Sequence, residues 1–252
     1  MANNEKKNRI PEEPSRFERQ LTIKEIGQEG QEKINSSNVL VVGAGGLGAP
    51  LLYALAGAGV GNITIVDGDF VSLGNLNRQF LYTQAEIGFR KADMAAVRLR
   101  SFNPDIRIEA VHHHVRPNNV EPLLDGKDMV LCAVDNIPTR MLLNRVCARR
   151  KIPLLNGGVE GLYGVLMAVE YGKTPCLECF YKHSSPQKEK GSALGAVSSV
   201  VASLMANTAI KMLLGNENPI PGEMLLYDGI NLTLEKIPVD RNPNCLVCGK
   251  IK

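Results

Sequence analysis

The sequence predicts an α/β protein whose mainly parallel sheet carries helices on both faces and continues into an antiparallel C-terminal part. Short apolar runs alternate with amphipathic stretches over residues 38–156, and this alternation is typical of a parallel sheet. Beyond Gly157 the pattern changes to apolar runs on either side of one long helical stretch, which favours antiparallel strands. A glycine-rich turn directly after the first apolar run is the third observation.

Each element follows from a local pattern. Apolar runs bounded by turn residues predict five strands, at residues 38–43, 62–67, 106–111, 129–134 and 152–156. Helical spacing of apolar residues predicts helices at 19–35, 47–57, 91–102, 137–150 and 196–214. The later strands lie in GVLMAVEY and MLLYDGINLTLEKI. Right-handed crossovers should connect the parallel strands.

Composition narrows the class of protein. The chain has 252 residues, 44% of them hydrophobic and 22% charged, so one domain spanning 1–252 is expected. A net charge of +3 without an aromatic-interleaved basic stripe gives no indication of nucleic acid binding. Residues 1–18 are expected to be flexible, and the polar segment 182–191 is expected to form a mobile crossover loop.

No stretch is expected to enter a membrane or direct secretion. The first residues lack the apolar core of a secretory signal, so we expect a cytoplasmic protein. Residues 34–66 carry no charge, but seven glycines between Gly43 and Gly61 divide them into strand, turn and helix. Residues 192–210 are also uncharged, and their serines fit a buried helix better than lipid exposure.

The glycine-rich turn predicts a nucleotide site on a Rossmann-like sheet. GxGxxG is formed by Gly43, Gly45 and Gly48, with Gly46 between them, after a strand and before a helix. Glycine permits the tight turn and the close approach of phosphate to backbone N–H groups. Asp67 ends the second strand, where a carboxylate can bond ribose hydroxyls. Glycines that serve only helix packing are the alternative.

The turn alone does not select the nucleotide, because NAD, FAD and S-adenosylmethionine enzymes use similar turns. The chain continues with DGDFVSLGNLNRQFLY at residues 67–82 and with Lys91 in GFRKAD. These groups suit phosphate binding, whereas a dehydrogenase needs an acid or base beside a nicotinamide. An NAD-dependent oxidoreductase therefore ranks last.

Several motifs in order resemble the bacterial ubiquitin-activating-like adenylyltransferases, the MoeB, ThiF and HesA group, over nearly the whole chain. They are RFERQ at 16–20, GAGGLG at 43–48, the DxDxVxxxNLxRQ string at 67–79, Lys91, the pair at 135–136 and two CxxC pairs. The resemblance implies an enzyme that uses ATP and Mg²⁺ to adenylate a carboxylate.

The resemblance also implies site residues. The nucleotide would contact Gly43, Gly45, Gly46, Gly48, Asp67, Asp69, Asn75, Arg78, Gln79, Lys91, Asp135 and Asn136. Attack on an α-phosphate adds negative charge there and on pyrophosphate, so fixed cations should lower the barrier, and Arg78 and Lys91 are the candidates. Asp135 could hold Mg²⁺ at the carboxyl end of a strand, and its alternative role is a helix N-cap.

Arg19 is similar to a family arginine that reaches the phosphates of the neighbouring subunit. The resemblance therefore implies a catalytic role for Arg19 and a homodimer with composite sites. A surface arginine on the first helix is the alternative.

The cysteine pattern predicts one metal site. Two CxxC pairs, Cys176 with Cys179 and Cys245 with Cys248, are typical of four thiolates around a structural Zn²⁺. Zinc would then staple the C-terminal part to the crossover segment. Two disulfides are the alternative, which a reducing cytosol disfavours. The other two cysteines, at 132 and 147, are expected to be inert.

Together these features predict an ATP-dependent adenylyltransferase. The resemblance implies that its substrate is the C-terminal Gly-Gly carboxylate of a small ubiquitin-like sulfur-carrier protein, with pyrophosphate released. Family members that pass the product on through sulfur carry a cysteine before the long helix, whereas residues 184–195 here contain none. A covalent sulfur step on this chain is therefore not expected. A peptide or RNA-linked carboxylate, or a nucleotide-binding scaffold without turnover, are the alternatives.

Overall fold

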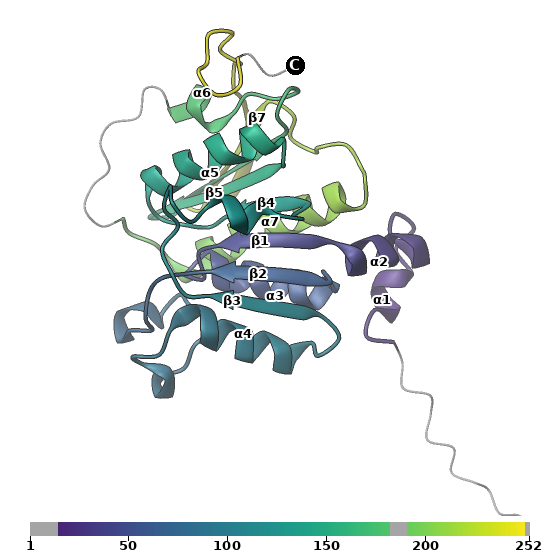
Figure 1. Cartoon of the computed structure of the whole chain (residues 1–252), viewed down its shortest axis with the longest axis vertical. Helices are drawn as coiled ribbons and strands as arrows, with labels where there is room; N and C mark the ends of the chain where they lie inside the picture. The colour runs from purple at the N-terminus through teal and green to yellow at the C-terminus, as the bar shows by residue number, and fades with distance from the viewer. Residues whose placement is uncertain (1–14, 182–190, 250–252) are drawn as a thin grey trace, which may run out of the picture.

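The computed structural model describes residues 15–181 and 191–249, and they contain one mixed sheet of eight strands in the order β3-β2-β1-β4-β5-β6-β7-β8 (Figure 1). The strands are β1 Asn38–Val42, β2 Asn62–Val66, β3 Arg107–Val111, β4 Met129–Cys132, β5 Leu154–Glu160, β6 Tyr163–Val169, β7 Glu223–Asp228 and β8 Thr233–Pro238. The helices are α1 Glu18–Leu21, α2 Gly27–Ser36, α3 Gly48–Ala58, α4 Lys91–Phe102, α5 Ile137–Arg150, α6 Leu177–Tyr181 and α7 Gly195–Leu213.

The predicted change of strand direction is confirmed. Neighbours from β3 to β5 pair in parallel, and β5, β6, β7 and β8 pair antiparallel. The central strand β1 is buried on both faces, with Val39 and Val41 on one side and Leu40 and Val42 on the other. That burial explains why its sequence is a continuous apolar run.

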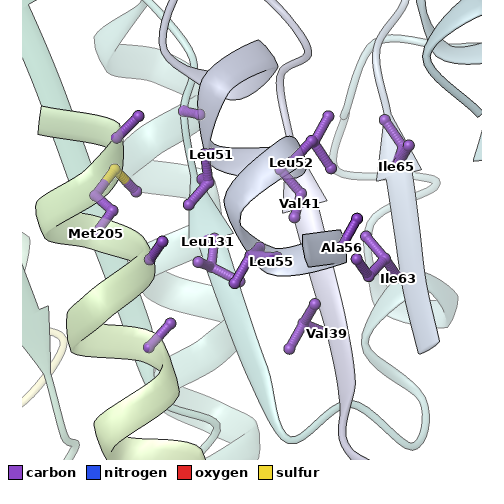
Figure 2. Close-up of a cluster of buried hydrophobic side chains, with 14 of the residues drawn as sticks. Val39, Val41, Leu51, Leu52, Leu55, Ala56, Ile63, Ile65, Leu131 and Met205 are labelled. Atoms are coloured by element: carbon purple, nitrogen blue, oxygen red, sulfur yellow. The ribbon is translucent and has the colours of Figure 1, made fainter. Parts of the chain in front are cut away.

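Helices cover both faces of the sheet, as predicted. α3, α4 and α7 pack on the face that carries Val39 and Val41, whereas α5 packs on the opposite face (Figure 1). Leu52 and Leu55 of α3 pack toward the strands, and Met205 of α7 lies beside α3 (Figure 2).

The long helix α7 is a core helix. Its length and composition would allow it to cross a membrane, yet Val201 and Met205 are 1% and 0% exposed inside the core. A Cβ added at Gly157 of β5 would lie 2.2 Å from the Met205 sulfur, and one at Gly164 of β6 would lie 2.2 Å from Val201 Cγ2. Glycine at these two positions therefore lets α7 lie directly on the sheet.

The prediction of a single helix over residues 19–35 is wrong. The chain forms α1 and α2 with a break between them, where the Thr22 hydroxyl donates to the carbonyl three residues earlier and Gly27 has φ +55°. Gln20 donates to the Ala58 carbonyl at 2.9 Å, which ties α1 to the end of α3. The break therefore combines a local turn at Gly27 with a contact between α1 and a distant segment.

Two further expectations differ in extent. β5 continues past Gly157 to Glu160, because its last residues pair with β6 across a turn at Gly161, where φ is +60°. The expectations for flexible residues 1–18 and a mobile loop at 182–191 fall outside the described residues, apart from 15–18 and Gly191.

Candidate functional site

The glycine turn lies at the carboxyl edge of the parallel strands, between β1 and α3. Gly43 has φ +96°, and a Cβ there would lie 2.7 Å from the Ala133 carbonyl oxygen after β4. A Cβ at Gly48 would lie 1.9 Å from the Gly43 oxygen. Leu47, the N-cap of α3, makes no side-chain cap bond. Backbone N–H groups at the start of α3 therefore suit an anion.

The segment that follows Asp67 covers this turn. A Cβ at Gly45 would lie 3.5 Å from Gln79 Nε2, and one at Gly46 would lie 3.1 Å from Arg78 Cγ. Gln79 is 4% exposed, and its Oε1 accepts no hydrogen bond from the residues that the structure describes. Buried acceptors are rarely left unpaired. This one, beside the glycine turn, fits a nucleotide that brings its own donor or a water.

Asp67 is fixed between two backbone donors. Its carboxylate accepts from the backbone N–H of Ala44 at 2.7 Å and of Asp69 at 2.8 Å. Burial raises the pKa of Asp67, while these two bonds and the charge of Lys91 lower it. Tyr82 donates to the Ala44 carbonyl at 2.8 Å, so the backbone around the carboxylate is held on both sides.

Lys91 is a buried cation paired with the carboxylate of Asp69, which His114 also approaches. Its side chain is 5% exposed, and Nζ lies 3.0 Å from Asp69 Oδ2, whose side chain is 57% exposed. The Lys91 N–H also donates to the Asp69 carbonyl at 3.0 Å. His114 Nε2 lies 3.9 Å from the other Asp69 oxygen. The ammonium is thus positioned in advance by a carboxylate that solvent or a ligand can reach.

Arg78 and Asn75 lie on the same covering segment. Arg78 Nη1 donates to the Gly74 carbonyl and to Asn77 Oδ1, each at 2.9 Å. Both acceptors are neutral, so these bonds orient the guanidinium without neutralising its charge. Asn75 Oδ1 accepts from the Ser72 hydroxyl at 2.9 Å. Arg78 therefore lies against the turn, while Lys91, the first residue of α4, lies close enough to Asp67 for its charge to act on that carboxylate.

Asp135 and Asn136 follow β4 at the same edge. Asp135 is exposed, and Asn136 is the N-cap of α5, accepting from the Thr139 N–H at 3.0 Å. The alternative that Asp135 caps this helix is therefore wrong.

Sequence analysis missed Arg140, which is 5% exposed inside α5. Its Nη1 donates to Asn156 Oδ1 and to the Gly157 carbonyl, each at 2.6 Å, and Nη2 donates to the Val134 carbonyl. Arg140 therefore ties the segment after β4 to β5. A signal was present, because Arg140 precedes the inward-facing Leu143 by three residues and so shares its helix face.

Arg19 does not join the other candidates within one chain. It is exposed on α1, which contacts the end of α3 at Ala58, whereas the glycine turn precedes Gly48 at the start of α3. The 11 residues of α3 span about 16 Å. Arg19 therefore lies at the opposite end of α3 from the glycine turn of its own chain.

The four predicted metal ligands lie together at the far end of the antiparallel part. Their sulfur atoms lie within 4.8 Å of one another, with 3.7 Å between Cys176 and Cys245 and 3.5 Å between Cys179 and Cys248. Four Zn–S bonds of about 2.3 Å place sulfurs about 3.8 Å apart, whereas a disulfide needs about 2.05 Å. All four thiols are free, so the cluster could hold zinc.

Comparison with known proteins agrees with this geometry. A family model described as the ThiF family matches residues 17–247. A SAMP-activating enzyme E1 from Haloferax volcanii is 38% identical over 240 residues, covering 93% of this chain and 88% of that protein. A sulfur carrier protein adenylyltransferase from Thermus thermophilus is 38% identical over 248 residues, covering 94% and 92%.

Longer relatives and a solved structure extend the comparison. The adenylyltransferase and sulfurtransferase MOCS3 of Anopheles gambiae is 38% identical over 245 residues, and the chain spans 56% of its length. The structure of E. coli MccB with ATP matches with a TM-score of 0.83 at 23% identity, covering 94% of this chain and 75% of that chain. This last likeness concerns the fold alone.

Proposed function

The chain belongs to the ThiF family, and we propose that it is an ATP-dependent adenylyltransferase for the C-terminal Gly-Gly carboxylate of a small ubiquitin-like sulfur-carrier protein. Relatives of similar length carry the names sulfur carrier protein adenylyltransferase and SAMP-activating enzyme E1. The observation that carries the proposal is the placement of Arg78 against the glycine turn, together with the buried cation Lys91 at the start of α4, which is paired with Asp69 of the covering segment.

The reaction needs these residues in defined places. A carboxylate oxygen of the partner attacks the α-phosphorus of ATP, the bond from that phosphorus to the bridging oxygen breaks, and pyrophosphate leaves with the electron pair. The glycine turn would bind phosphate oxygens and Asp67 the ribose. Lys91 and Arg78 would stabilise the charge that develops on the α-phosphate and on pyrophosphate.

Two metal ions complete the proposal. Asp135, exposed at the carboxyl end of β4, would bind Mg²⁺, a hard cation that prefers carboxylate oxygens and supplies further charge to the phosphates. Zn²⁺ would fill the four-thiolate cluster and hold the C-terminal segment to α6. Because all four positions around zinc are thiolates, its role would be structural.

We propose a homodimer with shared sites, because Arg19 lies at the opposite end of α3 from its own glycine turn. Subunits carrying Arg19→Ala and subunits carrying Lys91→Ala should each be inactive. After subunit exchange, half of the dimers are mixed and each has one intact site, so about a quarter of wild-type turnover should return. Mixtures that stay inactive, with mixed dimers shown by mass spectrometry, would count against shared sites.

Residues 1–252 would form a single adenylation domain that acts in the cytoplasm. Sulfur transfer would occur on another protein, because residues 184–195 contain no cysteine. The two cysteines outside the zinc cluster, Cys132 and Cys147, are also poor nucleophiles, because burial raises the pKa of both thiols above the ordinary value.

ATP–pyrophosphate exchange tests the function directly. Purified enzyme with ATP, Mg²⁺ and each Gly-Gly-ending small protein of the source organism should show exchange with one of them. A partner with its terminal glycine deleted is the matched control and should give none. Exchange at background with every candidate would refute the proposed function.

A further inference from the structure

A fully buried asparagine lies beside the four thiols and has no part in the proposed reaction. Asn144, on α5, is 0% exposed, and its side-chain Nδ2 donates to Cys176 Sγ at 3.6 Å. Sulfur is a larger atom than oxygen, so this separation is normal for an N–H···S hydrogen bond. Burying an amide costs free energy unless its donors and its acceptor are paired. The contacts of Asn144 therefore indicate what its side chain does.

Two donors fix which end of this amide faces the sulfur. Asn144 Oδ1 accepts from the backbone N–H of Leu177 at 3.2 Å. The Tyr171 hydroxyl lies 3.1 Å from the same Oδ1 and 2.9 Å from the Asn144 carbonyl oxygen. A backbone N–H can only donate, so the amide oxygen must face Leu177 and the amide nitrogen is left facing Cys176. Asn144 is thus held as a hydrogen-bond donor to the sulfur.

The two CxxC pairs are positioned in different ways. The first pair is tied to α5, because Asn144 binds Cys176 and the residue after it, and Arg145 Nη2 lies 3.5 Å from Glu178 Oε2 between the two cysteines. In the second pair, the Cys248 N–H donates to the sulfur of its own partner, Cys245, at 3.5 Å. Side chains of a distant helix therefore hold the first pair, whereas local backbone holds the second.

The charge of a filled site gives this donor a purpose. Four thiolates around one divalent ion carry two excess negative charges, and three of the four cysteines are buried. Buried charge is costly unless donors face it. A neutral amide N–H can stabilise a thiolate without competing with the metal for it. Hydrogen bonds to metal ligands orient those ligands and raise the affinity for the metal.

We propose that Asn144 is a positioning residue of the zinc site, whose amide donates to the Cys176 thiolate and holds this ligand in the geometry that zinc requires. The proposal goes beyond the adenylation reaction and depends on the zinc site alone. A role confined to packing would make Asn144 important for the zinc-free fold only. A role at the thiolate makes it important for zinc affinity as well, which separates the two accounts.

Asn144→Leu tests the proposal, because leucine keeps a similar volume and removes the donor. The Kd for zinc, measured by competition with a coloured chelator, should rise about tenfold or more. In protein loaded with Co²⁺, the sulfur-to-metal charge-transfer band should move to lower energy, since a sulfur without its N–H donor releases an electron more easily.

Asn103→Leu is the matched control. Asn103 ends α4, is also 0% exposed, and donates through its side chain to the Ala56 carbonyl at 2.7 Å, in the parallel half of the sheet. Its loss should destabilise the zinc-free protein, as the loss of Asn144 should. The zinc Kd and the cobalt spectrum should keep their wild-type values in Asn103→Leu.

Each other outcome has a distinct meaning. If Asn144→Leu keeps the wild-type zinc Kd and cobalt spectrum, or if both leucine variants weaken zinc equally, the inference is overturned while the zinc site stands. If Asn144→Leu does not fold, NMR of cadmium-loaded wild type replaces it: coupling between the metal nucleus and the Asn144 side-chain amide hydrogens supports the bond, and its absence overturns the inference. If the wild type binds no zinc, the inference fails with the zinc site, and pyrophosphate exchange still tests adenylation separately.

Discussion

The parallel and antiparallel halves of this sheet are shaped by different contacts. Around β1 and β4, backbone packs against backbone, so that a Cβ at Gly48 would lie 1.9 Å from a carbonyl oxygen. In the antiparallel half the notable contacts belong to side chains. Four thiols cluster at one edge, and the exposed Ile230 and Leu232 lie at the opposite edge. Bare backbone at the glycine turn lets a phosphate approach N–H groups closely, whereas a zinc site depends on four cysteine side chains. The two halves should therefore respond to different substitutions.

Gly48→Ala should destabilise the fold through the parallel half of the sheet. The added methyl group meets backbone that cannot move aside, so we expect the free energy of unfolding to fall by roughly 4 kcal/mol or more in urea titration. Gly74→Ala is the matched control, because a Cβ there meets nothing within 4 Å, and its cost should stay below about 1 kcal/mol. Equal losses for the two alanine variants would contradict this account of the turn.

Lys91→Met should remove activity from the same half without unfolding it. Methionine keeps the buried aliphatic length and loses the charge, so kcat for pyrophosphate exchange should fall roughly 10³-fold, which corresponds to about 4 kcal/mol of barrier. Lys127→Met is the control, because that lysine donates to Thr64 within the sheet and precedes β4 at the opposite edge. A loss below tenfold for Lys91→Met would remove Lys91 from the proposed mechanism.

Removing zinc should affect the antiparallel half alone. Freshly purified protein should contain one zinc per chain, and Cys248→Ser should abolish it. The lost cross-link closes a loop of some 70 residues, so the free energy of unfolding should fall by about 4 kcal/mol, while Kd for ATP stays within twofold.

Leu246→Ala is the control for the zinc site, because this leucine lies between the two C-terminal cysteines and is 97% exposed. It should retain both zinc and stability. Substoichiometric zinc in the wild type, or an ATP affinity that falls along with the metal, would contradict the independence of the two halves.

The same division explains what sequence analysis could predict. The parallel strands and the glycine turn were predicted because each depends on residues adjacent in sequence: a continuous apolar run, a GxGxxG motif and an acidic strand end. The four thiols were predicted because CxxC spacing is local within each pair. Their meeting across the C-terminal part depends on the fold, yet thiolate chemistry alone indicated it.

The features that were missed depend on distant contacts. The break between α1 and α2 includes Gly27, whose left-handed backbone was a local signal, and Gln20 fixes α1 against Ala58, which no local pattern indicates. Arg140 is buried because Asn156 and Gly157, from the next strand, supply its acceptors. The exposure of Ile230 and Leu232 at the β7–β8 turn was missed because apolar residues in a strand pattern are expected to be buried, and only the turn geometry exposes them.

The smallest expected effect concerns two aspartates, one in each half, whose replacement by asparagine should change the melting temperature in opposite directions. Burial raises the pKa of Asp67, so its ionised form destabilises the fold. Bonds from Asn231 and Ile230 lower the pKa of Asp228, so its ionised form stabilises the fold. At neutral pH, Asp67→Asn should therefore melt at or above the wild-type temperature while binding ATP more weakly, and Asp228→Asn should melt below it.

Melting temperatures across a range of pH test both signs. The stability that protonated Asp67 contributes is complete below the ordinary aspartate pKa of 3.8 and is lost as pH rises through its folded pKa. The advantage of Asp67→Asn should therefore disappear in acid. The stability from ionised Asp228 is present above 3.8 and is lost as pH falls through its folded pKa, so the deficit of Asp228→Asn should also disappear. Shifts of the same sign at neutral pH would show that hydrogen bonds, and not burial, dominate at Asp67.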